Sequence, residues 1–145
     1  MSAALDTDAA LRALADRAAI RDVLLRYARG VDRRDWPLVA ACFTPGAAAD
    51  YGYVAQGTIE EAIAAIAPAL EKLTSTMHVI GNQLIEIDGD TARSETYAVC
   101  YHRSGGLAAG ALMTVGVRYL DELVRRDGRW LICRRVVTFE WQQRP

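Results

Sequence analysis

The sequence contains two histidines, His78 and His102, and histidine has an ordinary pKa that suits proton transfer near neutral pH. His78 lies in the segment TMHVIGN, where the pattern predicts a strand and places its side chain on the same face as Ile80, Asn82 and Leu84. His78 is therefore a candidate general acid or base. A purely structural histidine within a sheet is the alternative that the residues leave open.

A tyrosine and an aspartate near the end of the first predicted helix could assist such chemistry. Tyr27 falls on the apolar face of that helix, and Asp32 follows just past Gly30, at the edge of the same face. A tyrosine hydroxyl can donate a hydrogen bond to a substrate oxygen, and a carboxylate can orient an imidazole. A core aromatic residue and a solvated carboxylate at a helix end are the corresponding alternatives.

An arginine on the last predicted strand is the most unusual charged residue of the sequence. Arg135 shares its predicted face with apolar side chains, namely Leu131, Cys133, Val137, Phe139 and Trp141. Such a position is costly unless a carboxylate, a ligand anion or the mouth of a cavity receives the guanidinium. A β-bulge would exchange Arg135 with Arg134, which otherwise shares the opposite face with Trp130 and Ile132.

Other common chemistries lack their residue patterns here. His78 and His102 have neither the HxH nor the HxxxH spacing of a metal site. The glycine-rich segment GGLAAG at 105–110 lies between two predicted strands, which indicates a hairpin loop rather than a phosphate-binding loop. No nucleophile elbow for Ser-His-Asp hydrolysis is present. We therefore expect no metal and no cofactor.

Composition limits the class of protein. The 145 residues are 52% hydrophobic and 24% charged with a net charge of −1, which predicts a single globular domain over 1–145 and disfavours nucleic-acid or membrane partners. Three scattered cysteines, Cys42, Cys100 and Cys133, indicate reduced buried thiols. The charged N-terminal segment does not resemble a signal peptide, so we expect a cytoplasmic protein.

The first half of the sequence predicts three helices and one strand. A helix over 8–31 buries Ile20, Val23, Leu24, Tyr27 and Val31, and a short helix capped by Asp35 reaches Cys42 before the break at 44–46. A strand over 47–54 carries Tyr51 and Tyr53 on one face. Thr58 and Glu61 form a capping box for a third helix, which Pro68 should kink or shorten.

The second half predicts two long β-hairpins. Segments 76–87 and 91–103 flank Asp88-Gly89, and segments 111–124 and 129–141 flank Asp127-Gly128, both strong two-residue turn signals. The order of elements is typical of an α+β fold. A curved, mostly antiparallel sheet around three N-terminal helices would form a cone-shaped barrel whose apolar interior is a natural ligand pocket.

Three segments together resemble a known family. ALADRAAIRDVLLRYARGVDRRDW, TMHVIGN, and RYLDELVRRDGRW followed by RRV resemble the SnoaL-like branch of the NTF2-like superfamily across nearly the whole chain. That branch includes scytalone dehydratase, bile-acid 7α-dehydratase, hexachlorocyclohexane dehydrochlorinase and polyketide cyclases. The resemblance implies the cone-shaped α+β fold. It specifies the reaction only weakly, because this superfamily contains enzymes, binding modules and subunits.

The resemblance also implies a set of site residues. The histidine–aspartate dyad of the dehydratases falls on His78 and Asp32, and the tyrosine and last-strand arginine of the bile-acid dehydratase match Tyr27 and Arg135. A further pocket tyrosine matches Tyr51 or Tyr53, and His102 could match the second histidine of scytalone dehydratase. Trp141, on the predicted face of Arg135, is a further candidate for substrate binding. The dehydrochlorinase has a lysine where this chain has Tyr27, which disfavours dehalogenation.

These residues predict a cofactor-independent lyase, a dehydratase acting on a hydrophobic cyclic substrate such as a steroid, polyketide or terpenoid. Neutral His78 would remove a proton next to a carbonyl, with Asp32 fixing its tautomer and Tyr27 and Arg135 stabilising developing charge. A cyclase or ketosteroid-type isomerase using the same dyad, and a non-catalytic binding or accessory module, are the alternatives. Exposed Trp130, Val136 and Trp141 would favour a homotrimer or homodimer.

Overall fold

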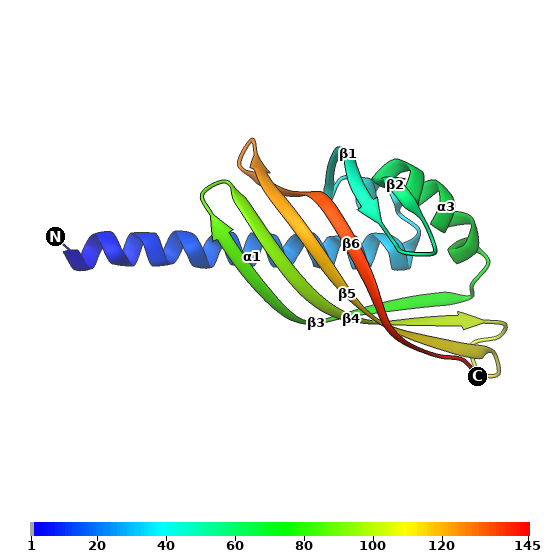
Figure 1. Ribbon diagram of the computed structural model, residues 1–145. Helices are drawn as coiled ribbons and strands as arrows, with labels where there is room; N and C mark the ends of the chain where they lie inside the picture. The colour runs from blue at the N-terminus through cyan, green and yellow to red at the C-terminus, as the bar shows by residue number, and fades with distance from the viewer. Residues whose placement is uncertain (1) are drawn as a thin grey trace.

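The computed structural model describes residues 2–145, so Met1 of the predicted 1–145 domain lies outside the described residues. Three helices and six strands follow one another along the chain (Figure 1). Their bounds are α1 Ser2–Arg33, α2 Trp36–Ala40, β1 Phe43–Asp50, β2 Gln56–Thr58, α3 Ile59–Glu71, β3 Ser75–Asp88, β4 Thr91–Ser104, β5 Ala111–Arg126 and β6 Arg129–Gln143. Within residues 2–145, no helix is long and apolar enough to cross a membrane.

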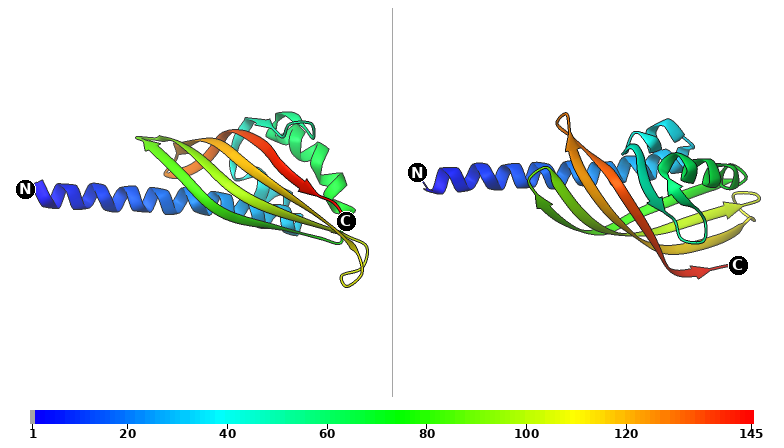
Figure 2. Two further views of the ribbon diagram at one scale, coloured as in Figure 1. Left: turned by 60° about the horizontal axis from the view of Figure 1, so that its bottom comes forward. Right: turned by 45° about the horizontal axis from the view of Figure 1, so that its top comes forward.

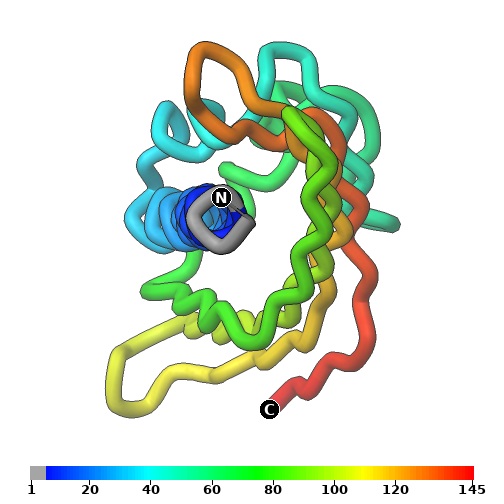
Figure 3. The backbone as a smooth tube through the Cα atoms, turned by 90° about the vertical axis from the view of Figure 1, so that its left-hand side faces the viewer, coloured from blue at the N-terminus to red at the C-terminus, as the bar shows by residue number. Residues whose placement is uncertain are grey.

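The six strands form one sheet in the order β2-β1-β6-β5-β4-β3. Every neighbouring pair is antiparallel except β1 and β6, which are parallel. The long strands bend strongly, so that the sheet curves around one side of α1 without closing into a full barrel (Figures 2 and 3). The predicted α+β class with three helices inside a curved, mostly antiparallel sheet is confirmed.

Helix α1 closes the open side of this curved sheet. Its buried face consists of the predicted residues Ile20, Val23, Leu24, Tyr27 and Val31. The helix begins six residues before the predicted start, at Ser2, and its N-terminal part extends beyond the sheet (Figure 1). Asp16 fastens the helix to the β5–β6 hairpin by accepting hydrogen bonds from Arg125 at 2.6 Å and from Trp130 Nε1 at 3.0 Å.

The two shorter helices begin where their caps predict. Asp35 accepts a hydrogen bond from the Leu38 backbone at the start of α2, which ends at Ala40 rather than at Cys42. Thr58 and Glu61 form both hydrogen bonds of the capping box, at 3.3 and 2.8 Å, and open α3. Pro68 lies inside α3, which continues to Glu71. Cap geometry therefore fixes where α2 and α3 begin.

The first strand differs from its prediction. Strand β1 begins at Phe43 and includes 44–46, which the sequence indicated as a break. It ends at Asp50, so Tyr51 and Tyr53 lie in the loop that follows and do not share a strand face. Tyr51 is buried, whereas Tyr53 is 78% exposed. The loop turns at Gly52, whose positive φ of 58° suits glycine.

Three β-bulges change which side chains of the hairpins face inward, two in β6 at Cys133 and Glu140 and one in β3. Opposite β5, Glu122 pairs with Arg134 and Leu123 with Ile132, which leaves Cys133 as an extra residue. Trp130 and Ile132 are consequently buried on the side of Arg135, and Leu131 and Cys133 are not, contrary to the predicted pattern. Trp130 is only 4% exposed, so the prediction that it forms an exposed association surface is wrong.

The bulge in β3 lies between Ile80 and Gln83 and has the same kind of effect. Leu84, predicted to share the face of His78, is 67% exposed, and Ile85 is buried instead. Both hairpin turns lie within a residue of their predicted places, at Gly89-Asp90 and Asp127-Gly128. The turns thus set the pairing at the ends of the strands, and the bulges reset it further along.

Candidate active site

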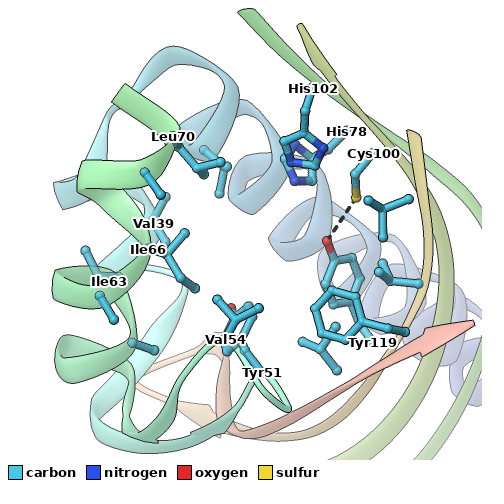
Figure 4. Close-up of a pocket in the computed structure, with 18 of the residues that line it drawn as sticks. Val39, Tyr51, Val54, Ile63, Ile66, Leu70, His78, Cys100, His102 and Tyr119 are labelled. Atoms are coloured by element: carbon cyan, nitrogen blue, oxygen red, sulfur yellow. Dashed lines mark hydrogen bonds between the residues drawn. The ribbon is translucent and has the colours of Figure 1, made fainter. Parts of the chain in front are cut away.

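A cavity of about 450 Å³ lies inside the cone, between α3 on one side and the concave face of the sheet on the other (Figure 4). Its walls are mostly apolar. The apolar side chains include Val31, Val39, Ile59, Ile63, Ile66, Leu70, Met113, Val115, Val117, Val137 and Phe139. The polar side chains are Tyr27, Tyr51, Tyr53, His78, Cys100, His102, Tyr119, Gln142 and Arg144. A cavity with apolar walls and a few convergent polar groups is the usual form of a small-molecule site.

His78 and Asp32 meet at one wall of this cavity. His78 Nδ1 lies 2.6 Å from Asp32 Oδ1, and the backbone N–H of His78 donates to Asp32 Oδ2 at 2.9 Å. The carboxylate therefore holds both the ring and the backbone of His78. Since Nδ1 faces the carboxylate, Nε2 is the ring nitrogen available for proton exchange.

Asp32 is itself held by a short chain of polar groups. It lies in the last turn of α1, and Thr76 Oγ1 of β3 donates to its Oδ1 at 3.1 Å. The Arg34 guanidinium donates to Thr76 Oγ1 at 2.7 Å and to the Leu70 carbonyl of α3 at 2.8 Å. Arg34 thus ties α1, β3 and α3 together around the carboxylate. Such outer hydrogen bonds fix the geometry of the groups that they surround.

The environment drives the two histidines to opposite charge states. Burial lowers the pKa of His78, but the Asp32 carboxylate and the Cys100 sulfur outweigh this effect and raise that pKa to about 9. Burial, together with the charge of His78, lowers the pKa of His102 to about 4. The two rings lie edge to face with their centroids 5.9 Å apart. At neutral pH, His78 is therefore charged and His102 neutral.

Cys100 and Tyr119 complete the polar wall of the cavity, and the sequence did not predict a role for either in the site. Cys100 is the direct cross-strand partner of His78, and its Sγ lies 3.9 Å from the hydroxyl of Tyr119 (Figure 4). The turn at 89–90 alone would place Tyr101 opposite His78, and the β3 bulge moves Cys100 into that position. The bulge lies at Gly81 and Asn82, and a glycine inside a predicted strand is the sequence signal that could have located it.

A pair of tyrosine hydroxyls lies elsewhere in the cavity wall. Tyr27 Oη and Tyr51 Oη are 2.9 Å apart and both buried. Burial raises the pKa of Tyr27 well above its ordinary value, so this phenol stays protonated. One hydroxyl donates to the other, which leaves one O–H free to donate to a ligand oxygen.

Arg135 lies beneath this wall and does not line the cavity. Its guanidinium donates to both carboxylate oxygens of Asp121, at 2.7 and 2.8 Å, and both side chains are fully buried. Its Cζ lies 4.2 Å from the ring centre of Tyr27 and 4.3 Å from that of Tyr119. The rings of Tyr27 and Tyr119 therefore separate Arg135 from the cavity.

The remaining predicted residues are divided between the cavity and the outer surface. Tyr51, Tyr53 and His102 line the cavity. Trp141 is 49% exposed and borders a separate surface groove with Tyr97 and Gly116, so the structure does not bring it to the cavity. An added Cβ at Gly116 would collide with the indole ring, which shows how closely Trp141 packs there. Among residues 2–145, no group of three or more His, Cys, Asp or Glu could hold a metal ion.

Comparisons with known proteins agree with this architecture. The family model of the SnoaL-like domain matches residues 12–136. An uncharacterised protein of Mycobacterium tuberculosis is 32% identical over 132 residues, which cover 86% of each chain. The structure of hexachlorocyclohexane dehydrochlorinase LinA-type3 from Novosphingobium barchaimii is similar with a TM-score of 0.77 at 21% identity, covering 93% of both chains. A scytalone dehydratase-like protein of Novosphingobium aromaticivorans has a TM-score of 0.75 at 21% identity, covering 90% of this chain and 87% of the other.

Proposed function

The chain belongs to the SnoaL-like domain family, and from this premise we propose that it is a cofactor-independent lyase of the dehydratase type. The observation that carries the proposal is the 2.6 Å contact between His78 Nδ1 and Asp32 at the wall of an apolar cavity. Two structural neighbours, a dehydrochlorinase and a scytalone dehydratase-like protein, are named for elimination reactions, which is why we consider this reaction class. Their low identity supports the fold alone, so the residues must carry the mechanism.

The proposed reaction is loss of water from a β-hydroxy carbonyl compound. Neutral His78 removes the proton from the carbon next to the carbonyl through Nε2, and Asp32 stabilises the imidazolium that forms. The electron pair of the broken C–H bond forms the C=C bond as the C–O bond breaks. The imidazolium then returns its proton to the departing hydroxide, so water leaves and His78 is regenerated.

The tyrosine pair would stabilise the enolate-like oxygen during this step. The O–H that Tyr27 and Tyr51 leave free is suited to donate to the carbonyl oxygen as it gains charge. We assign Arg135 an indirect role in place of direct charge stabilisation, because Asp121 and the rings of Tyr27 and Tyr119 surround it. Its positive charge opposes the effect of burial on the pKa of Tyr27 and so strengthens that phenol as a donor.

The raised pKa of His78 determines how the cycle begins. With a pKa of about 9, roughly 1% of the empty protein carries neutral His78 at pH 7. The active base is therefore a minority form at neutral pH, in equilibrium with the ion pair to Asp32. This makes pH a direct probe of the mechanism.

The cavity supports a hydrophobic cyclic substrate. Aliphatic side chains of α3 face the polar wall across a space of about 450 Å³, within the usual range for sites that bind small ligands. A steroid, a polyketide or a terpenoid bearing a β-hydroxy ketone fits these requirements. Polyketide cyclisation and ketosteroid-type isomerisation would use the same proton abstraction with a different fate of the enolate, and a ligand that binds without turnover would indicate a binding module.

We also propose that the protein forms a homotrimer or homodimer. Since Trp130 is buried, the proposal now rests on apolar side chains exposed on the outer sheet face, including Val79, Leu84, Leu120 and Trp141. Size-exclusion chromatography with light scattering tests it directly. A monomer at micromolar concentration would contradict it.

The function is tested with a panel of cyclic β-hydroxy ketones of steroid, polyketide and terpenoid type, following enone absorbance. His78→Gln and Asp32→Asn should each lower kcat/KM on the best substrate by about 10²–10⁴-fold, the usual contribution of a positioned base. The matched control is Asp35→Asn, which changes an exposed capping carboxylate to another good capping residue and should leave turnover unchanged. Full activity in both dyad variants would refute the mechanism.

A further inference from the structure

Cys100 occupies a position from which it can react together with the dyad. It pairs directly with His78 across β3 and β4, and side chains of directly opposed residues lie about 4.5–5.5 Å apart at Cβ. Its sulfur lines the cavity beside His78 and Tyr119 (Figure 4). Asp32 holds Nδ1 of His78, which leaves Nε2 for the thiol. Carboxylate, imidazole and thiol thus follow one another in the order found in nucleophilic catalysis.

We propose that Cys100, His78 and Asp32 give the cone a second activity, the covalent capture of α,β-unsaturated carbonyl compounds. Cys100 is the nucleophile, His78 carries the proton, and Asp32 orients the imidazole. The ligand class is an apolar cyclic enone, because the cavity walls around the thiol are apolar and the polar wall presents a hydroxyl donor to a carbonyl oxygen.

The addition balances without any further reactant. The neutral form of His78, which is the minor form at pH 7, takes the Sγ–H proton of Cys100, and the thiolate forms an Sγ–C bond at the β-carbon of the enone. The π electrons move to the carbonyl oxygen, where the free tyrosine O–H can stabilise the enolate. The imidazolium then gives its proton to the α-carbon. The product is a neutral thioether, and His78 and Asp32 return to their starting states.

The other cysteines lack this arrangement and serve as internal controls. Cys42 Sγ donates to the Leu38 carbonyl at 3.3 Å, and burial raises the pKa of Cys42 to about 11. Cys133 Sγ donates to the Glu122 carbonyl at 3.3 Å. Neither lines the cavity that holds the dyad. Cys42 and Cys100 are equally buried, at 4% exposure each, so surface exposure does not explain a difference in their reactivity, and the dyad variants separate the effect of His78 and Asp32 from that of the cavity.

This inference goes beyond dehydration and does not require it. If the proposed lyase reaction also occurs, its product is itself an α,β-unsaturated carbonyl compound, so Cys100 would capture a fraction of the product and slow the enzyme. Labelling of the resting protein by an added enone tests the thiol alone. A protein that is labelled but dehydrates no substrate would contradict the lyase proposal only.

The experiment treats the full chain with 2-cyclohexen-1-one at pH 7 and follows adducts by intact-mass and peptide mass spectrometry. We expect a single adduct at Cys100, unchanged in Cys42→Ala and absent in Cys100→Ala. His78→Gln and Asp32→Asn should each slow labelling of Cys100 at least about tenfold, and thermal melting identifies any variant that fails to fold. Labelling after unfolding in guanidinium should be equal for all chains that retain Cys100.

Three results would overturn the proposal. They are no adduct in the wild-type protein, earlier labelling of Cys42 or Cys133 than of Cys100, or labelling of Cys100 at the wild-type rate in both folded dyad variants. The Asp32→Asn variant keeps the test decisive if His78→Gln does not fold, because it preserves the imidazole and changes only the group that orients it.

Discussion

Two carboxylate–cation pairs lie in the core of this protein, and they differ in almost every property except distance. Asp32 and His78 are 2.6 Å apart at the wall of the cavity, with side chains 22% and 8% exposed. Asp121 and Arg135 are 2.7 Å apart between β5 and β6, with no exposure at all. The first pair has an imidazole whose pKa is raised to about 9, so it still titrates, whereas the second has a guanidinium that stays charged.

One of these pairs supports the structure, and the other is placed where it can take part in chemistry. Asp121 and Arg135 are direct cross-strand partners, and aromatic rings cover the cation, so that pair does not exchange protons with a ligand. Asp32 and His78 join the end of α1 to β3, and the imidazole borders the cavity. Tyr27 lies between the two regions, with its ring over Arg135 and its hydroxyl bonded to Tyr51.

The largest effect should come from breaking the sealed pair. Arg135→Met leaves Asp121 buried without a partner, which should destabilise the fold by about 3–5 kcal/mol. The double variant Asp121→Leu/Arg135→Met removes both charges and should recover most of that loss. Denaturant unfolding measures both, and Arg134→Met is the control, because the pair of Arg134 with Glu122 is exposed and should contribute little. A single variant as stable as Arg134→Met would contradict a structural role for the pair.

The titrating pair should control activity through pH. Because the proposed base is neutral His78 and its pKa is raised to about 9, kcat/KM should rise about tenfold per pH unit below 9 and level off above it. Between pH 7 and pH 9 the increase is roughly 50-fold, because half of His78 is neutral at pH 9. Asp32→Asn removes the main group that raises this pKa, so its remaining activity should level off at lower pH. A rate that falls above pH 9 would show that His78 acts as an acid instead.

Stability should distinguish the pairs in the same pH range. The pKa of His78 is higher in the folded chain than in the unfolded one, so its ion pair stabilises the fold fully below about pH 6.5. That contribution, at most about 3 kcal/mol, is lost as pH rises through 9. Urea unfolding from pH 6 to pH 10 should show this loss in the wild type and in Arg134→Met but not in His78→Gln. Equal slopes in all three proteins would assign the loss to other groups.

The sequence predicts local features of this protein better than it predicts contacts between distant segments. Helical spacing places Tyr27 correctly, and short-range signals such as the Thr58 capping box and the two glycine turns are confirmed. The proximity of Asp32 to His78 came from the family resemblance, because residues so far apart in sequence carry no local signal of contact. Cys100 was missed for a different reason.

The register of the strands determines the contacts that the sequence did not predict. A bulge adds one residue to a strand and reverses every side chain beyond it. Gly81 marks the place of the bulge in β3, whereas no residue type marks the bulge at Cys133 in β6. The bulge at Cys133 buries Trp130 on the side of Arg135, and the bulge after Ile80 sets Cys100 opposite His78. Asp121 compensates the buried charge of Arg135, and the sequence did not identify this partner because the two residues meet only through the pairing of β5 with β6. Long-range pairing is therefore where reasoning from a single sequence stops.

The smallest predicted effect concerns two buried threonines on neighbouring strands, Thr76 on β3 and Thr96 on β4. Thr76 Oγ1 donates to Asp32 and accepts from Arg34, whereas Thr96 Oγ1 is fully buried and has no partner among the described residues. Thr76→Val deprives the carboxylate of one hydrogen bond and removes one acceptor of Arg34, which keeps the carbonyls of Val31 and Leu70. Stability should fall by about 1 kcal/mol and kcat/KM by roughly fivefold. Thr96→Val removes a hydroxyl that bonds to nothing and should be neutral or slightly stabilising, with unchanged turnover. If both variants behave alike, the polar groups behind Asp32 do not position the dyad, and its geometry depends on the strand backbone alone.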